Sequence, residues 1–106
     1  MSVQLKNNAF TTVPTGVSST DTTVTVATGD GSKFPALGSE EYFYLTLVDV
    51  SGNYEIVQVT ARVDDVLTIV RGQGDTLPIP FPPNSRAELR VTVENVLVAA
   101  GDYLLL

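Results

Sequence analysis

The chain has 106 residues, a formal net charge of −6, 43% hydrophobic residues and no cysteine, histidine or tryptophan. Without cysteine and histidine it cannot form disulfides, cysteine-based zinc sites or catalytic triads that depend on imidazole. An acidic chain with only 6 lysines and arginines is poorly suited to nucleic acid, and no apolar run reaches the roughly 18 residues that suggest a membrane helix.

Residue usage predicts an all-β fold. Val and Thr are the commonest residues, and both fit the pleated surface of a sheet. Gly and Pro break the apolar runs at fairly regular spacing, which is typical of a β-sandwich or barrel. We therefore expect a single small antiparallel β-sandwich or barrel. Residues 1–20 would be an extended N-terminal arm, 21–93 the β core and 94–106 an apolar C-terminal tail.

The first predicted strand covers residues 22–27, with the sequence TTVTVA. Its apolar and polar residues alternate, so Val24 and Val26 should share one buried face. A Gly-rich turn at residues 29–32 follows, because glycine adopts positive φ at little steric cost. We expect the next loop to bury Phe34.

The strongest signal is a hairpin formed by residues 41–50, EYFYLTLVDV, and 54–63, YEIVQVTARV. The two runs flank a short loop that contains Gly52, a common arrangement for antiparallel neighbours. A third strand at 66–71 follows the tight turn Asp64–Asp65. Residues 41–71 are therefore predicted to form an antiparallel meander.

The chain should leave the sheet at residues 72–75, and the segment 77–84, LPIPFPPN, should be extended because proline cannot donate to a ladder. A strand is predicted to resume at 86–93, with Ala87, Leu89, Val91 and Val93 on its buried face. Residues 94–100 could then form one or two helical turns that end at Gly101, or another strand.

Three apolar surfaces are candidate interfaces. The first is the second face of the strand 41–50, since an antiparallel strand usually has one solvated face; it would be covered either within the domain or by another subunit. The second is the proline-rich segment, either a rigid surface loop or an arm that clasps a neighbour. The third is the apolar C-terminus, which would pack on its own core or on a partner. The candidate interface residues are Tyr42, Tyr44, Ile79, Phe81, Tyr103, Leu104, Leu105 and Leu106.

No motif predicts catalysis, a metal site or a cofactor. The adjacent pairs Glu40–Glu41 and Asp64–Asp65 would point to opposite faces of a strand or form a turn, rather than converge across a cleft. The segment ATGDGS lacks the ligand spacing of a calcium loop. We expect Arg71 to form an exposed ion pair with Asp75 or Glu88, which would contribute about 0–1 kcal/mol.

Several short motifs together resemble a known family. The segments TDTTVTVATGDGSKFPAL, YFYLTLVDVSGNYEIVQVTARVDDVLTIVRGQGDT and PPNSRAELRVTV are similar to the small β domain at the N-terminus of many tailed-phage tail-fibre and tailspike-type proteins. The shared motifs are the "FP" at Phe34–Pro35, "GN.EIV" at Gly52–Val57, "RGQ" at Arg71–Gln73 and the closing strand at Arg86–Thr92. The resemblance covers about residues 20–93.

The resemblance implies attachment rather than chemistry. In that family the domain fixes a fibre to the virion, usually as a trimer, and no catalytic residue is implied. The segment LPIPFPPNS departs from the family's Ala-rich segment, so this loop could have its own partner. No shaft follows within the 106 residues, which favours an adaptor or collar subunit over a receptor-binding fibre.

These expectations lead to three functional hypotheses. The first is a structural protein of a phage tail or neck, made in the host bacterial cytoplasm, that assembles as a homotrimer or other ring and contacts other virion proteins. The second is a capsid decoration protein that stabilises the head. The third, from another class, is a carbohydrate-binding module that uses Tyr42, Tyr44 or Tyr54, because aromatic side chains can stack on sugars. Nucleic acid and membrane are not expected partners.

Overall fold

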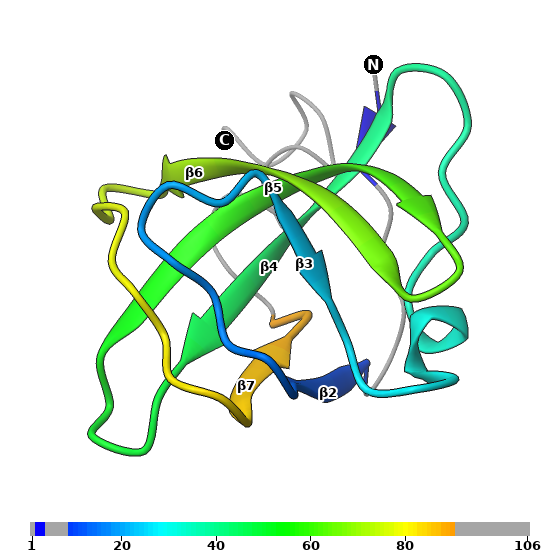
Figure 1. Cartoon of the computed structure of the whole chain (residues 1–106). Helices are drawn as coiled ribbons and strands as arrows, with labels where there is room; N and C mark the ends of the chain where they lie inside the picture. The colour runs from blue at the N-terminus through cyan, green and yellow to red at the C-terminus, as the bar shows by residue number, and fades with distance from the viewer. Residues whose placement is uncertain (1, 4–8, 91–106) are drawn as a thin grey trace.

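The computed structural model describes residues 2–3 and 9–90, which form a nearly closed, barrel-like β-sheet (Figure 1). Six strands follow the spatial order β2-β7-β4-β5-β6-β3, with every neighbouring pair antiparallel, and β1 adds a short parallel pairing to β4. The predicted all-β fold is confirmed, and it is a barrel-like sheet. The strands are β1 (Ser2–Val3), β2 (Phe10–Val13), β3 (Thr23–Thr25), β4 (Glu41–Val48), β5 (Tyr54–Val63), β6 (Val66–Gln73) and β7 (Ser85–Glu88).

The predicted meander is confirmed as β4, β5 and β6, the three longest strands. Strands β4 and β5 pair from Phe43↔Val59 to Val48↔Tyr54. Their connecting loop is held by the Asp49 carboxylate, which accepts hydrogen bonds from the backbone N–H groups of Ser51 and Asn53. Side-chain capping of this kind replaces the ladder bonds that a turn cannot make.

The sheet closes through strands that are distant in the sequence. Strand β7 lies between β2 and β4, so both ends of the described chain contribute to one side of the barrel. The two end strands of the sheet approach each other where the Ala27 N–H, just beyond β3, donates to the Thr12 carbonyl of β2 at 3.0 Å. This contact makes the barrel nearly continuous.

Three sequence-based boundaries need correction. Residues 10–13 belong to the sheet as β2, and Val13 is fully buried, so the expected arm at residues 1–20 includes part of the barrel. Strand β6 continues to Gln73, which pairs with Ile56, so the chain does not leave the sheet at Gly72 as expected. Strand β7 ends at Glu88, short of the predicted 93. The helical turn or strand expected at 94–100, and the buried positions Val91 and Val93, lie outside the described residues.

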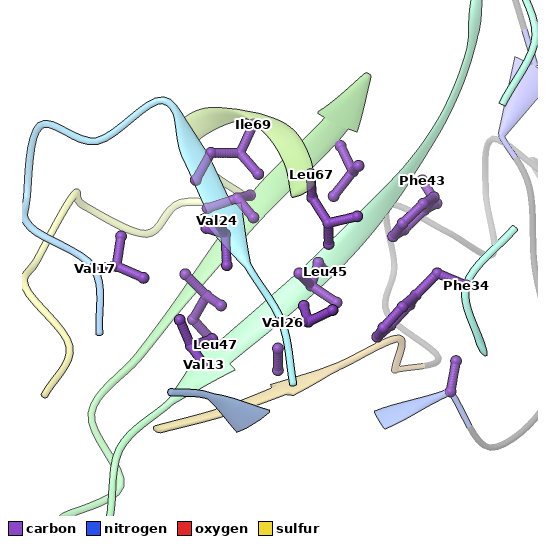
Figure 2. Close-up of a cluster of buried hydrophobic side chains, with 14 of the residues drawn as sticks. Val13, Val17, Val24, Val26, Phe34, Phe43, Leu45, Leu47, Leu67 and Ile69 are labelled. Carbon is purple, nitrogen blue, oxygen red and sulfur yellow. The ribbon is translucent and has the colours of Figure 1, made fainter. Parts of the chain in front are cut away.

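The barrel interior is filled by one apolar cluster (Figure 2). Phe43, Leu45 and Leu47 of β4 point into it and have no exposed surface, as period-2 alternation requires. Phe34 is buried as predicted, and its ring stacks on that of Phe43 with a centroid separation of 5.8 Å. The cluster consists of Ala9, Val13, Val17, Val24, Val26, Phe34, Tyr42, Phe43, Leu45, Leu47, Val57, Val59, Leu67, Ile69, Phe81 and Ala87.

A short 3₁₀ helix, η1 (Asp30–Lys33), joins β3 to the Phe34 loop. The Asp65 carboxylate, at the β5–β6 turn, accepts hydrogen bonds from the N–H groups of Gly29 and Gly31 at 3.0 and 2.9 Å. Gly31 is required because a Cβ there would lie 1.9 Å from the Asp64 carbonyl oxygen. The β5–β6 turn and η1 are therefore locked together.

Candidate functional site

The structure removes two residues from the predicted interface. Tyr42 and Phe81 retain only 6% and 3% exposure and belong to the chain's own core. Phe81 also exchanges two backbone hydrogen bonds with Val17, at 2.8 and 2.9 Å. The expectation that these two side chains anchor a neighbouring subunit is therefore wrong, because the barrel itself buries them.

The remaining interface candidates divide into two groups. Tyr44 and Ile79 are half-buried and pack against the core, so each keeps only part of its surface for a partner. Tyr103, Leu104, Leu105 and Leu106 lie outside the described residues. On the second face of β4, Val48 is also half-buried, whereas Val50 lies beyond the strand and is 99% exposed.

The proline-rich segment is fastened to the barrel by a buried ion pair. Glu55 has no exposed surface, and its two carboxylate oxygens accept hydrogen bonds from Nε and Nη2 of Arg71, both at 2.8 Å. The same carboxylate accepts the N–H groups of Gly72 and Ile79. Arg71 does not pair with Asp75 or Glu88 as expected, because its side chain turns inward to Glu55.

Arg71 also ties together separate loops. Its guanidinium donates to the backbone carbonyls of Ser18, Asp21 and Ile79. Burial alone would raise the pKa of Glu55, but the hydrogen bonds from Arg71, Ile79 and Gly72 outweigh it and hold this pKa below its ordinary value. The carboxylate is thus charged at neutral pH, and the cluster joins strands β5 and β6 to two connecting segments.

Other acidic motifs serve local structure. Asp64–Asp65 forms the expected turn, with Asp64 at φ 54°. The Glu41 carboxylate accepts the Gly38 N–H at 2.6 Å. Within residues 2–3 and 9–90, no three Asp or Glu side chains are grouped to hold a metal ion. The same residues include no helix of the length and hydrophobicity that a bilayer crossing demands.

A surface groove of about 470 Å³ lies over β2 and β7 and is bordered by η1. Its most prominent apolar group is the Phe10 ring, since this residue is 59% exposed. The Lys33 ammonium lies 5.3 Å from the centre of that ring, within reach of a cation–π interaction. The groove is lined by Phe10, Thr11, Thr12, Asp30, Lys33, Arg86 and Glu88; we call it the Phe10 groove.

The charged side chains that line this groove are paired with each other or with a neighbour. Arg86 and Arg90 both donate to the same Oε2 atom of Glu88, each at 2.9 Å. Lys33 pairs with Asp30 at 3.4 Å. The groove lining therefore holds two cations, Lys33 and Arg86, and two carboxylates, Asp30 and Glu88.

Both groove carboxylates are held in the charged form. The hydroxyl of Thr11 donates to Asp30 at 2.6 Å and, with the nearby Lys33, lowers the pKa of Asp30. Desolvation acts to raise the pKa of Glu88, but hydrogen bonds from Arg86 and Arg90 outweigh it and lower this pKa. The groove thus has fixed charges around an exposed aromatic ring, an arrangement suited to binding rather than proton transfer.

Sequence reasoning missed both the buried ion pair and the groove. Glu55 lies on the core face of β5 with Val57 and Val59, so period-2 alternation could have identified a carboxylate that needs a buried cation. No comparable signal predicts the groove, because it depends on β2 pairing with β7 across most of the chain.

Comparison of the chain with models of known protein families, and with curated proteins, finds no match.

Proposed function

We propose that this protein is a structural component of a tailed-phage virion, located in the tail or neck. It assembles as a symmetric homo-oligomer and anchors or bridges neighbouring virion components, as an adaptor or collar subunit. The proposal rests on the resemblance of residues 20–93 to virion-attachment domains.

One structural observation supports this function: three of the motifs that carry the resemblance place a side chain in the interior, and two of them form a buried pair. Glu55 of the "GN.EIV" motif holds Arg71 of the "RGQ" motif in the buried ion pair. Phe34 of the "FP" motif stacks on Phe43 of the long strand β4. An attachment domain performs no chemistry, so we expect the motifs common to such domains to stabilise the fold rather than to line a reactive cleft.

The test is the copy number of the protein in purified particles of the phage that encodes it, measured by quantitative mass spectrometry against the major capsid and tail proteins. We expect a small fixed number that matches a ring or a set of fibres at the tail. Labelling with an antibody against the purified protein, viewed by electron microscopy, should place it at the tail or neck.

Two results would contradict the proposal in different ways. A copy number that scales with the capsid lattice would replace the tail assignment with head decoration. Complete absence from washed particles would remove both virion roles and leave carbohydrate binding to be tested. For that alternative, Tyr54 is the aromatic side chain to substitute, since it is 53% exposed whereas Tyr42 is buried and Tyr44 half-buried.

A further inference from the structure

We propose that the Phe10 groove is a binding site for a neutral carbohydrate of one or two sugar rings. Its volume of about 470 Å³ lies within the range of small-ligand sites, roughly 300–1,000 Å³. The inference goes beyond the proposed role in the virion, and it uses a site other than the tyrosines considered above. It is carried by three properties of the groove: balanced charges, unused hydrogen-bonding groups and an exposed aromatic ring.

The charges in the groove favour a ligand without net charge. Its lining holds two cations and two carboxylates, which already pair as Lys33 with Asp30 and Arg86 with Glu88. A phosphate or sulfate would be repelled by the two carboxylates, and a cation would be repelled by Lys33 and Arg86. A zwitterion such as an amino acid would compete with the existing pairs for the same groups. A neutral ligand meets none of these obstacles.

The same side chains keep donors and acceptors that a hydroxyl-rich ligand can use. Arg86 donates to Glu88 through Nη2, whereas its Nε and Nη1 have no acceptor in the part of the chain that the structure describes. Arg86 and Arg90 both donate to Oε2 of Glu88, so Oε1 is left without a donor among the described residues. The hydroxyl of Thr12, also in the lining, has no partner within residues 9–90. Because a sugar hydroxyl both donates and accepts, a carbohydrate can satisfy both kinds of group.

The border of the groove is held in place before a ligand binds. The Asp30 carboxylate accepts a hydrogen bond from the Thr11 hydroxyl at 2.6 Å, so η1 is fastened to strand β2. The Asp65 carboxylate also holds η1, through the N–H groups of Gly29 and Gly31. Since these elements are already ordered, binding a ligand requires little further loss of conformational freedom.

The Phe10 ring gives the groove an apolar surface on which a sugar can stack. Phe10 is not part of the core cluster, and it is 59% exposed although the Lys33 ammonium lies 5.3 Å from the centre of its ring. A cation–π contact at such an exposed site is weak, so a ligand can displace the ammonium. The C–H groups on one face of a sugar ring carry partial positive charge and fit the negative face of an aromatic ring.

The test is an NMR titration of the isotope-labelled full chain with neutral sugars, namely methyl β-D-glucoside, methyl β-D-galactoside, N-acetyl-D-glucosamine and L-rhamnose. We expect at least one of them to shift the backbone amide signals of residues 10–12, 30–33 and 86–88. Its dissociation constant should be about 1–10 mM, as expected for a ligand of about a dozen non-hydrogen atoms. The same constant should be found in about 0.05 M and 0.5 M NaCl, because salt does not screen the binding of a neutral ligand.

Substitutions of exposed residues show whether the sugar lies in the groove. Phe10→Ser should raise the dissociation constant at least about tenfold, whereas Phe10→Trp, which keeps an aromatic ring, should bind at least as tightly as the wild type. Arg86→Met removes hydrogen-bond donors and should raise the constant at least about threefold. The matched control is Tyr54→Ser, which removes another exposed aromatic ring (53%) and should bind like the wild type. Thermal unfolding of every variant verifies that it is folded.

The inference is overturned if none of these sugars binds at about 100 mM, ten times the weakest expected dissociation constant. It is also overturned if Tyr54→Ser weakens binding as much as Phe10→Ser, or if the groove signals respond to sodium phosphate or glycine at matched ionic strength and not to the sugars. The proposed function can survive each of these results, since its own test is the presence and copy number of the chain in virions. Conversely, absence from virions would remove the proposed function even if a sugar bound in the groove.

Discussion

Arg71 and Glu55 face each other across β5 and β6 through two parallel hydrogen bonds of 2.8 Å, with 9% and 0% of their side chains exposed. A bidentate pair of this kind is directional, and removing one member leaves a charge without compensation in the interior. We therefore expect the Glu55–Arg71 pair to contribute strongly to the stability of the barrel.

We expect Arg71→Gln to lower the free energy of unfolding by about 3–5 kcal/mol, because Glu55 would then be buried without its cation. Urea unfolding followed by circular dichroism measures this change. The matched control is Arg86→Gln, which breaks an exposed pair and should cost no more than about 1 kcal/mol. A small effect of Arg71→Gln would mean that water reaches Glu55 in solution.

Replacing both members of the pair should cost less than removing one. In the double variant E55M/R71M no buried charge remains, and methionine fills irregular space well. We expect its stability to lie above that of Arg71→Gln, although the loop contacts of Arg71 with Ser18 and Asp21 are lost. A double variant less stable than the single one would show that these loop contacts outweigh the buried charge.

Stability should fall at acidic pH, in part through Glu55. Its pKa is lower in the folded chain than in the unfolded one, so its contribution is fully present above the unfolded pKa of about 4.3 and is lost as the pH falls through the folded value. We expect an unfolding midpoint in urea that is nearly constant between about pH 7 and 5 and decreases below about pH 4. Glu55→Gln should show a shallower decrease than the wild type.

Gly31→Ala should be strongly destabilising for a steric reason. The new Cβ would lie 1.9 Å from the Asp64 carbonyl oxygen and 2.9 Å from Oδ1 of Asp65, so the β5–β6 turn must move away from η1. We expect a loss of at least about 2 kcal/mol in thermal or urea unfolding. In the control Gly52→Ala the side chain meets open space, and only the strain of φ +87° should remain, about 1 kcal/mol. Equal losses of unfolding free energy in the two variants would show that the β5–β6 turn moves away from η1 at little cost.

Phe34→Ala should leave a cavity beside Phe43. Its ring is 1% exposed and stacks on Phe43, so we expect a loss of about 3–5 kcal/mol in the free energy of unfolding. Phe10→Ala removes the same ring from the surface and should change the stability of the monomer by less than about 0.5 kcal/mol. A large loss for Phe34→Ala and a small one for Phe10→Ala would show that Phe34 stabilises the fold, whereas Phe10 does not.

The parts of the fold that sequence predicts are those set by local pattern. The hairpin of β4 and β5 follows from alternation around a Gly-containing loop, and the burial of Phe34 follows from its place after a turn. Strand β2 escaped prediction because four residues carry little periodic signal and its partner β7 is remote. Phe81 looked like an exposed anchor because a proline-rich segment suggests a surface arm, yet its pairing with Val17 draws it into the core.

The position of β7 between β2 and β4 has a consequence for biosynthesis. Thr11 pairs with Ala87, which in turn pairs with Leu47, so a nascent chain cannot complete the barrel until the ribosome has released β7. Before that moment the meander presents β4 as an open edge beside apolar side chains, the kind of edge that joins other chains in aggregates. A product shortened before Ser85 should therefore accumulate in inclusion bodies, whereas the full barrel encloses this edge.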